Sequence, residues 1–267
     1  MAQLERRDNT RMKTFLKLLA IRLAVLAVVF GIWEAIAVLG LVEEYVLSRP
    51  SRVWAWLQDS ALSAFFWINV GVTVRETLLG LAVGAVLGIV SGFVLAQWRG
   101  AFVVLEPFIM ALYSLPRVAL APLFLVWFGI GERSKVALAA SLVYFVMLLN
   151  TYTGIREIDQ SWVHAARTMG ASEGFIARRI LFPAALTFIF AGLRVSIGLA
   201  LIGTIVGEMI AGQYGLGQMI ARAANMYDTA QVFGIIFVLA ILAVVLNEAM
   251  KLVEQRVMKW QPPSRRF

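Results

Sequence analysis

The chain has 267 residues, of which 61% are hydrophobic and 15% are charged, and its formal net charge is +8. Because a water-soluble domain usually carries about 25% charged residues, this chain has too little polar surface to cover itself in water, and we predict an integral membrane protein. The absence of cysteine excludes a disulfide framework, a thiol nucleophile and a cysteine-ligated metal site, and the single histidine leaves little for any other metal site.

Six segments are long and apolar enough to cross a bilayer as helices of about 20 residues. In chain order they are 18–42, 72–96, 102–130, 136–154, 182–210 and 230–252. Backbone polar groups in lipid must be satisfied within their own segment, and the sequence shows no alternation typical of a β-barrel. The predicted fold class is therefore all-α, a polytopic membrane protein with six transmembrane helices.

The basic residues predict the orientation of these spans. With the N-terminus inside, 16 Lys and Arg residues fall on the cytoplasmic side and five on the opposite side, which favours cytoplasmic termini and an even number of spans. Topology thus explains the positive charge without nucleic acid. A cleaved secretory signal is the alternative for the first apolar segment, since Ala35-Ile36-Ala37 has a small-x-small pattern, but the apolar run continues to Val42.

We expect one membrane domain, because no linker, low-complexity tract or tandem repeat divides the chain. It covers residues 18–254 and includes a cytoplasmic segment at 155–180, while residues 1–17 form a cytoplasmic N-terminal segment and residues 255–267 a basic cytoplasmic tail. Two further polar stretches, 43–69 and 211–229, are expected to be outer loops.

The second span carries a glycine at every fourth position, at Gly80, Gly84, Gly88 and Gly92. One stripe of this helix therefore has no side chains, which allows close approach of another helix in lipid. Two interpretations stay open: packing inside the same bundle, or a sliding or dimer-forming surface.

The third span is interrupted by Leu115-Pro116 and Ala121-Pro122. Each proline removes a backbone donor and disfavours helix at the preceding residue, so we expect a kinked or partly unwound segment. Irregular backbone at membrane depth occurs where it is buried in protein or lines a wet cavity, so this segment is either a packing kink or part of a translocation path.

Charged residues inside spans are costly and tend to face a bundle interior or a water-filled path. Arg117, Arg194 and Glu208 are therefore candidate path residues together with Pro116 and Pro122. Arg194 and Glu208 are 14 positions apart, about 21 Å along a helix, so they cannot pair directly. Arg75 and Glu76 lie near a membrane edge, where an interfacial position would suffice.

The segment 155–180 is predicted to form a helix-turn-helix at the cytoplasmic face. Ser161 is the expected cap of a first helix that ends at Gly170, Ser172 or Ala171 begins a second, and Pro183 is expected to interrupt the chain as it re-enters the bilayer. The apolar side chains of this segment lack a large soluble domain of the same chain to pack against, so they lie on the membrane surface or fill a groove on a partner.

This segment resembles the signature of ABC importer permeases, Glu-Ala-Ala, three residues, Gly, nine residues, Ile-x-Leu-Pro. His164 stands at the position of the glutamate and Phe182 at that of the leucine. Ala165, Ala166, Gly170, Ile180 and Pro183 stand at the matching spacing. The candidate ATPase-coupling residues are His164, Ala165, Ala166, Met169, Gly170, Ile180 and Pro183. The resemblance implies that this segment is a coupling helix that docks on an ATPase, with His164 as a polar docking residue.

Further motifs are similar to the nitrate/sulfonate/taurine branch of those permeases, among them Trp127-Phe128-Gly129-Ile130-Gly131, Gly207-Glu208-Met209-Ile210 and Gly215-Leu216-Gly217. The resemblance implies a type I ABC importer (MetI-like) permease fold in a bacterial inner membrane. It also implies as partners two cytoplasmic ATPase subunits that bind ATP and Mg, a second permease copy forming a homodimer, and an external solute-binding protein. The implied solute is a small anion such as nitrate, a sulfonate or taurine.

The chain contains no Gly-x4-Gly-Lys-Ser/Thr sequence, so no cofactor is expected on this chain, and its energy source must be another subunit. It also lacks an HExxH sequence and a Gly-x-Ser-x-Gly elbow, which argues against an intramembrane hydrolase. An ion-coupled secondary carrier is the alternative function; it would usually show inverted repeats, which we do not find clearly.

Overall fold

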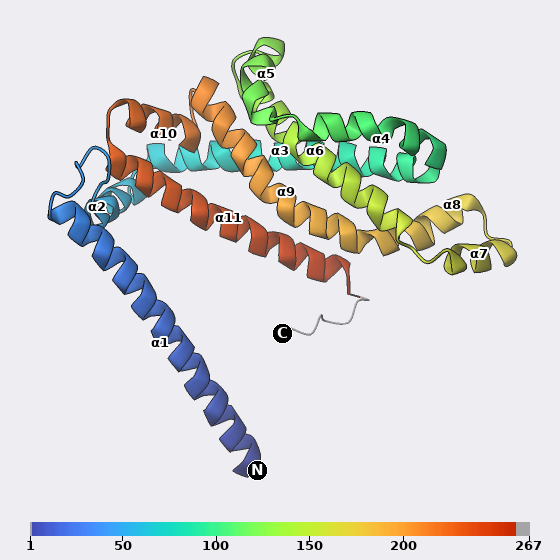
Figure 1. Cartoon of the computed structure of the whole chain (residues 1–267), viewed down its shortest axis with the longest axis horizontal. Helices are drawn as coiled ribbons and strands as arrows, with labels where there is room; N and C mark the ends of the chain where they lie inside the picture. The colour runs from blue at the N-terminus through green and yellow to red at the C-terminus, as the bar shows by residue number, and fades with distance from the viewer. Residues whose placement is uncertain (1, 260–267) are drawn as a thin grey trace. The chain divides into compact units, whose positions relative to one another are not determined.

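A computed structural model describes residues 2–259 of the chain, so Met1 and residues 260–267 of the expected basic tail lie outside the described part (Figure 1). Between residues 2 and 259 the structure is almost entirely helical and has no strand, which confirms the all-α fold class. The helices are α1 (Ala2–Val38), α2 (Pro50–Ala61), α3 (Ala64–Gln97), α4 (Arg99–Ser114), η1 (Arg117–Leu120), α5 (Ala121–Phe128), α6 (Glu132–Arg156), α7 (Gln160–Thr168), α8 (Glu173–Ile176), η2 (Ala177–Leu181), α9 (Phe182–Ala211), α10 (Leu216–Asn225) and α11 (Thr229–Val257).

Five helical segments are long and apolar enough to span a membrane, and a bent pair adds a sixth if it counts as one span. The five are Ala20–Val38, Ala64–Gln97, Glu132–Arg156, Glu173–Ala211 and Thr229–Val257. The bent pair joins Gly100–Ser114 to Arg117–Phe128 at 76°. Each predicted span thus has its counterpart. The two stretches expected to be outer loops contain the short helices α2 and α10.

The chain divides into two compact units. The first contains residues 1–63 and 223–234, and the second contains residues 64–222 and 235–267. In the first unit, Glu34 of α1 accepts hydrogen bonds from the Ser51 backbone N–H (3.1 Å) and hydroxyl (2.8 Å). This carboxylate therefore caps the N-terminus of α2, where negative charge is favourable. The Thr229 hydroxyl donates to the Glu44 backbone carbonyl (3.0 Å), which connects the start of α11 to the loop between α1 and α2.

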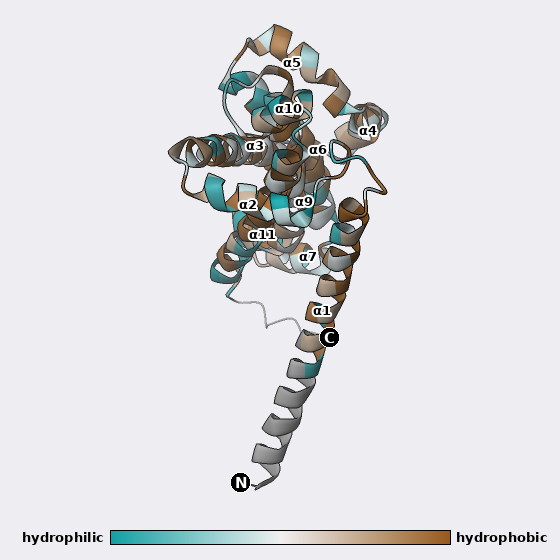
Figure 2. Ribbon diagram, turned by 90° about the vertical axis from the view of Figure 1, so that its left-hand side faces the viewer, coloured by the Kyte–Doolittle hydropathy of each residue, from teal (hydrophilic) through white to brown (hydrophobic). Residues whose placement is uncertain are grey.

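In the second unit, α3 lies along α6 through the glycine stripe. A Cβ added at Gly80 would lie 2.5 Å from the Ala139 Cβ, and one at Gly92 would lie 2.5 Å from the Leu148 carbonyl oxygen. The stripe therefore serves helix packing inside this chain. On α3, the apolar side chains of Val86, Leu87 and Val90 are exposed while the glycines are buried, as expected for a helix with one face toward lipid. Figure 2 colours the ribbon by hydropathy and shows the brown, hydrophobic residues of α3.

The order of these contacts fixes the direction of the helices. Contact positions rise together along α3 and α6, so the two helices are parallel. The chain between them must return to the end where it started, so the bent pair of α4 and α5 crosses back through the bundle as a broken span. Along α9, by contrast, Gly192 approaches Asn150 and Gly207 approaches Lys135, so α9 runs antiparallel to α6.

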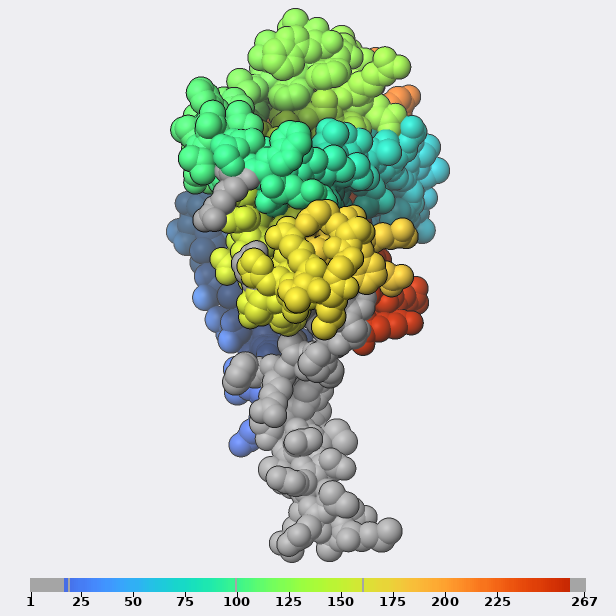
Figure 3. All heavy atoms as spheres, turned by 90° about the vertical axis from the view of Figure 1, so that its right-hand side faces the viewer, coloured from blue at the N-terminus to red at the C-terminus, as the bar shows by residue number. Residues whose placement is uncertain are grey.

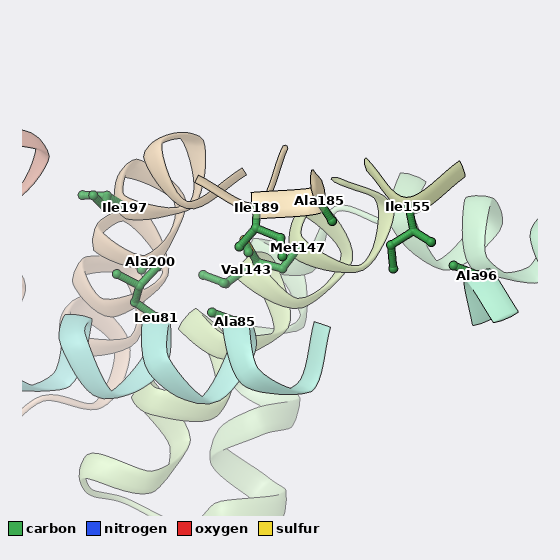
Figure 4. Close-up of a cluster of buried hydrophobic side chains, with 10 residues drawn as sticks. All are labelled: Leu81, Ala85, Ala96, Val143, Met147, Ile155, Ala185, Ile189, Ile197 and Ala200. Carbon is green, nitrogen blue, oxygen red and sulfur yellow. The ribbon is translucent and has the colours of Figure 1, made fainter. Parts of the chain in front are cut away.

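The apolar core of this unit lies between α3, α6 and α9 (Figure 4). Val143 and Met147 of α6 are fully buried, and Ile189 and Ala200 of α9 pack against them. The remaining buried members of the cluster are Leu81, Ala85, Ala96, Ile155, Ala185 and Ile197. This three-helix core connects the two ends of the bundle, and candidate functional residues lie at both ends.

Candidate coupling segment and buried polar cluster

The segment between α6 and α9 forms the predicted helix-turn-helix. Helix α7 ends in a Schellman motif, in which the Ala171 N–H donates to the Ala166 carbonyl (3.0 Å) and the Gly170 N–H to the Arg167 carbonyl (2.9 Å). Gly170 has φ +80°, a left-handed conformation that favours glycine. The sequence prediction that Gly170 ends this helix is confirmed.

Side-chain caps and one ion pair fix the shape of the turn. Asp159 caps α7 by accepting from the Ser161 N–H (2.9 Å), so the expected cap at Ser161 was wrong, whereas Ser172 caps α8 as predicted. The hydrogen bond from the Ser161 backbone holds the pKa of the Asp159 carboxyl below its usual value. Arg167 makes two hydrogen bonds with Glu173 across the turn (2.8 and 3.0 Å), and this carboxylate raises the pKa of the guanidinium.

The docking candidates lie mostly on the exposed side of this segment (Figure 3). Met169 is 87% exposed, and Trp162 and Phe175 are both more than half exposed, although all three are large apolar side chains. His164, Ala165 and Gly170 are exposed as well, and Ala166 is half-buried. On its other side the segment is anchored by Val163 and Ile176, which are buried.

Ile180 and Pro183 lie where the segment joins α9. Ile180 belongs to the π-helical turn η2, and both residues are half-buried. Pro183 does not interrupt the chain, contrary to the prediction, because it sits in the first turn of α9, directly after η2. In the π turn, the Phe182 N–H bonds to the Ala177 carbonyl, and the additional residue of this turn lets proline follow in a continuous helix.

A cavity of about 260 Å³ separates part of the segment from the turn between α3 and α4. Val163, Arg167 and Glu173 line it from the coupling segment, and Gln97 and Trp98 line it from the turn. The segment is thus supported at its Ile176 side but leaves open space beneath the Arg167–Glu173 pair.

At the break of the third span, Arg117 is buried and its guanidinium is used inside the chain. It donates to the backbone carbonyls of Tyr113 (2.7 Å), Leu112 (3.3 Å) and Ser141 (3.2 Å), and it lies 4.3 Å from the centre of the Phe145 ring. The carbonyls released at the end of α4 thereby obtain a charged donor. Pro116 sits at the 76° bend, whereas Pro122 starts α5 without a break.

The other two candidate path residues do not meet each other, as their spacing predicts. Arg194 is 49% exposed and pairs with Glu254 of α11 at 3.3 Å. Glu208 is fully buried near the C-terminal end of α9. The five candidate path residues therefore lie in three separate places: the break, the Arg194–Glu254 pair and the surroundings of Glu208.

Glu208 belongs to a polar cluster that binds the start of α10. Three successive backbone N–H groups there each have a different side-chain acceptor. The Gly215 N–H donates to Asn69 Oδ1 (2.6 Å), the Leu216 N–H to Thr73 Oγ1 (2.8 Å), and the Gly217 N–H to Glu208 Oε2 (2.7 Å). The Thr73 hydroxyl in turn donates to Glu208 Oε1 (2.8 Å). Gly215 and Gly217 are glycine positions for a steric reason, because a Cβ at either would collide with the Glu208 side chain.

Glu76 and Lys135 complete this cluster and were missed as site residues in the sequence. Lys135 of α6 donates to Glu76 Oε1 of α3 at 2.5 Å, and both side chains are almost fully buried, so Glu76 is not interfacial. Its neighbour Arg75 is exposed and pairs with Glu132 (3.0 Å). The available signal was the run of polar residues Asn69, Thr73 and Glu76 along one apolar helix.

A second cavity of about 260 Å³ lies beside this cluster, and its lining includes Arg75, Glu76, Glu132, Lys135 and Tyr214. Between residues 2 and 259, no group of three or more His, Asp or Glu side chains is arranged to hold a metal ion.

Comparisons with known proteins give the following matches. Residues 84–259 match the family described as the binding-protein-dependent transport system inner membrane component. A Bacillus subtilis protein named for aliphatic sulfonates transport is 31% identical over 88% of this chain and 85% of its own length. The formylaminopyrimidine transport permease protein of Halalkalibacterium halodurans is 32% identical, over 86% and 91%. The taurine transport system permease protein of Escherichia coli is 28% identical, over 88% and 87%.

Among solved structures, a chain of the inward-facing MetNI methionine ABC transporter superposes with a TM-score of 0.66. The match covers 74% of this chain and 98% of that chain at 19% identity, so it bears on the fold alone. It confirms the predicted type I ABC importer permease fold.

Proposed function

Since the chain belongs to the family of binding-protein-dependent transport system inner membrane components, a family of ABC importer permeases, we propose the following assembly for it. Two copies of the chain form the translocation path for a small solute that an external binding protein delivers. Two cytoplasmic ATPase subunits bind ATP and Mg and hydrolyse the nucleotide, so this chain itself is not an enzyme.

One observation carries the proposal: the large apolar side chains Trp162, Met169 and Phe175 are exposed around the rigid Gly170 turn. Exposed apolar side chains that gather on one short helical element are typical of a surface that fills a groove on a partner. The Schellman motif and the Arg167–Glu173 pair hold the turn rigid, and α8, η2 and α9 follow as continuous helix. A displacement of the segment by an ATPase would therefore pass directly into α9.

The orientation follows from the same assignment. If the coupling segment is cytoplasmic, α9 runs outward from it, antiparallel to α6, which places the start of α10 at the outer face. A last span, α11, that crosses the membrane from there then ends inside. The distribution of Lys and Arg supports this orientation and cytoplasmic termini in a bacterial inner membrane. On this assignment the domain extends over residues 18–254, between a cytoplasmic N-terminal segment (1–17) and a cytoplasmic tail (255–267).

For the solute we propose a small anion of the nitrate, sulfonate or taurine class. Two of the relatives are named for transport of aliphatic sulfonates and taurine, while a third is named for formylaminopyrimidine transport. Within the chain, Arg194 is the candidate that supports an anion best, because it is half exposed in the middle of a span, where its guanidinium is paired with Glu254. Arg117 and Glu208 are buried and use their polar atoms in contacts within the chain.

The absence of cysteine makes the ATPase contact directly testable. A Met169→Cys variant, expressed with the ATPase subunit of the same transporter carrying cysteines along its docking cleft, is expected to cross-link to it in membranes. Leu62→Cys is the matched control and should not cross-link, because Leu62 is 91% exposed and directly follows α2, distant in sequence from the coupling segment. Recovery of the permease without an ATPase, and solute uptake that survives ATP depletion, would overturn the assignment.

A second experiment tests coupling itself. Gly170→Pro should abolish transport and uncouple ATPase stimulation while leaving membrane insertion intact, because proline cannot adopt the positive φ of this turn. Normal uptake by this variant would contradict the role of the segment.

A further inference from the structure

The cluster at the start of α10 contains two carboxyl groups and one ammonium group. The side chains of Glu76 and Lys135 are 4% and 5% exposed, and Glu208 is not exposed at all. If all three were ionised, the cluster would bury one uncompensated negative charge. Burial of an unpaired charge in a low-dielectric interior costs several kcal/mol, so such a group usually binds a proton instead.

The hydrogen bonds show where the unsatisfied atom lies. Both oxygens of Glu208 already accept, one from the Thr73 hydroxyl and the other from the Gly217 N–H. Glu76 Oε1 accepts from Lys135. Glu76 Oε2 is buried and receives no hydrogen bond from any described residue. The Glu76 and Glu208 carboxyl groups are neighbours, because Thr73, which donates to Glu208, lies one helical turn before Glu76 on α3. In addition, Gly207, next to Glu208, packs against Lys135, the partner of Glu76. A single proton on Glu76 Oε2 would therefore satisfy this orphan oxygen and neutralise the excess charge.

We propose that Glu76 and Glu208 share one buried proton, and that this protonated pair latches the start of α10 to α3 and α9. With the proton in place, Glu76 donates to Glu208, and Glu208 keeps its two acceptor positions for Thr73 and Gly217. The proton thus completes a network that holds three consecutive backbone N–H groups of Gly215, Leu216 and Gly217. Glu208 is a positioning residue in this arrangement, since it acts through the α10 backbone.

The charged groups around the pair agree with one proton. Lys135 of α6 neutralises one carboxylate. Glu132 of α6 adds a further negative charge that acts on Glu76, and it is itself paired with Arg75. Arg75 is 70% exposed and points to Glu132, and α10 supplies only backbone N–H groups among the hydrogen bonds to this cluster. Apart from Lys135, no buried cation faces the pair within the described residues to replace the proton.

The latch is expected to open as pH rises. Removal of the proton leaves two carboxylates opposite one ammonium, and their repulsion weakens the hold on the Gly217 N–H. Because one proton is released on opening, the ratio of released to latched molecules rises by at most about tenfold per pH unit. Low pH therefore stabilises the latched state, and alkaline pH favours release.

The two carboxyl groups should respond differently to replacement by glutamine, and this difference is the first test. Glu76→Gln imitates the protonated acid, because its amide donates to Glu208 while its oxygen still accepts from Lys135. Glu208→Gln has only one acceptor oxygen, so either Thr73 or Gly217 loses its partner. The proposal predicts that Glu76→Gln stays latched at every pH, and that Glu208→Gln is released at every pH.

Release is measured by thiol labelling of the complete transporter in membrane vesicles. Met219→Cys on α10 is the reporter, because Met219 is 7% exposed and a cysteine there reacts only when α10 leaves the bundle. Leu62→Cys is the reference that corrects for the pH dependence of the thiol itself. Relative to this reference, labelling of Met219→Cys should rise between pH 6 and pH 9, and Glu76→Gln should abolish the rise. A pH-independent ratio, or the same rise in Glu76→Gln, would overturn the proposal.

Infrared spectroscopy of the purified wild-type chain gives a readout that does not depend on either variant folding. A protonated carboxyl has a C=O stretch that an ionised one lacks, and in deuterated buffer this band should be present near pH 6 and disappear on alkaline titration together with the onset of labelling. Absence of a titrating band would show that both carboxylates are ionised and would refute the shared proton. None of these outcomes depends on the ATPase contact of Met169, so failure here leaves the proposed transport function untouched.

Discussion

Replacing Gly88 with alanine adds one methyl group where the backbones of α3 and α6 are in close contact. The added Cβ would lie 2.5 Å from the Tyr144 carbonyl oxygen and 2.6 Å from the Met147 Cβ. Ordinary contacts between heavy atoms need about 3.5–4.0 Å, so the helices must separate locally by roughly 1 Å. The obstructing atoms belong to backbone and to a Cβ, which cannot turn aside as a flexible side chain would. We expect overpacking to lower the free energy of unfolding by about 1–3 kcal/mol.

Gly71→Ala is the matched control on the same helix, because a Cβ there meets no atom within 4 Å. Both substitutions gain the helix propensity of alanine over glycine, about 1 kcal/mol, so their difference isolates the packing at Gly88. Reversible unfolding of the purified chain in mixed micelles, followed by circular dichroism, measures both. If Gly88→Ala were as stable as Gly71→Ala, the stripe would not be the contact surface of α6, and the parallel packing argued from it would be wrong.

Three further predictions concern single residues. Arg117→Met leaves the carbonyls at the break without their donor, so the free energy of unfolding should fall by about 1–3 kcal/mol, and an unchanged value in the same assay would count against this role. Gly170→Ala should cost about 1 kcal/mol at φ +80° and raise hydrogen exchange in α7, whereas Gly174→Ala, with open space around it, should not; equal exchange would contradict the turn assignment. Stability at the start of α7 should be constant at neutral pH and be lost as pH falls below about 3.9 through the lowered pKa of Asp159, and Asp159→Asn should remove this dependence in amide exchange at Ser161.

Features that depend on local sequence could be predicted. Helical geometry alone predicts that the four glycines of α3 lie on one face. The sequence left open whether this face packs inside the same chain, and the structure places α6 against it. Pro116 and Gly170 each impose a backbone constraint that neighbouring residues cannot remove, so the bend and the turn lie where the sequence places them. The cap of α7 was displaced by two residues, because Asp159 and Ser161 are both good capping residues and only the position of the first helical turn decides between them.

The polar cluster could not be predicted, because its bonds join distant parts of the chain. Glu208 is 135 residues from Thr73, and Lys135 is 59 residues from Glu76. No local pattern reports which of several polar residues in apolar helices will meet. Pro183 was predicted wrongly for a different reason. A proline normally interrupts a helix, but here the wider π turn before it accommodates the proline in a continuous helix. The polar cluster is thus set by tertiary contacts, and the position of Pro183 by the backbone of the turn that precedes it.

The close approach along the glycine stripe has a mechanical consequence. Over more than three helical turns the backbones of α3 and α6 are in close contact without intervening side chains, so neither helix can slide or rotate without separating from the other. The two helices therefore act as one rigid unit along the length of the bundle. The structure can bend at the Pro116 break, where the backbone lacks regular α-helical hydrogen bonding. Strain introduced at either end of this helix pair would thus be relieved at that break.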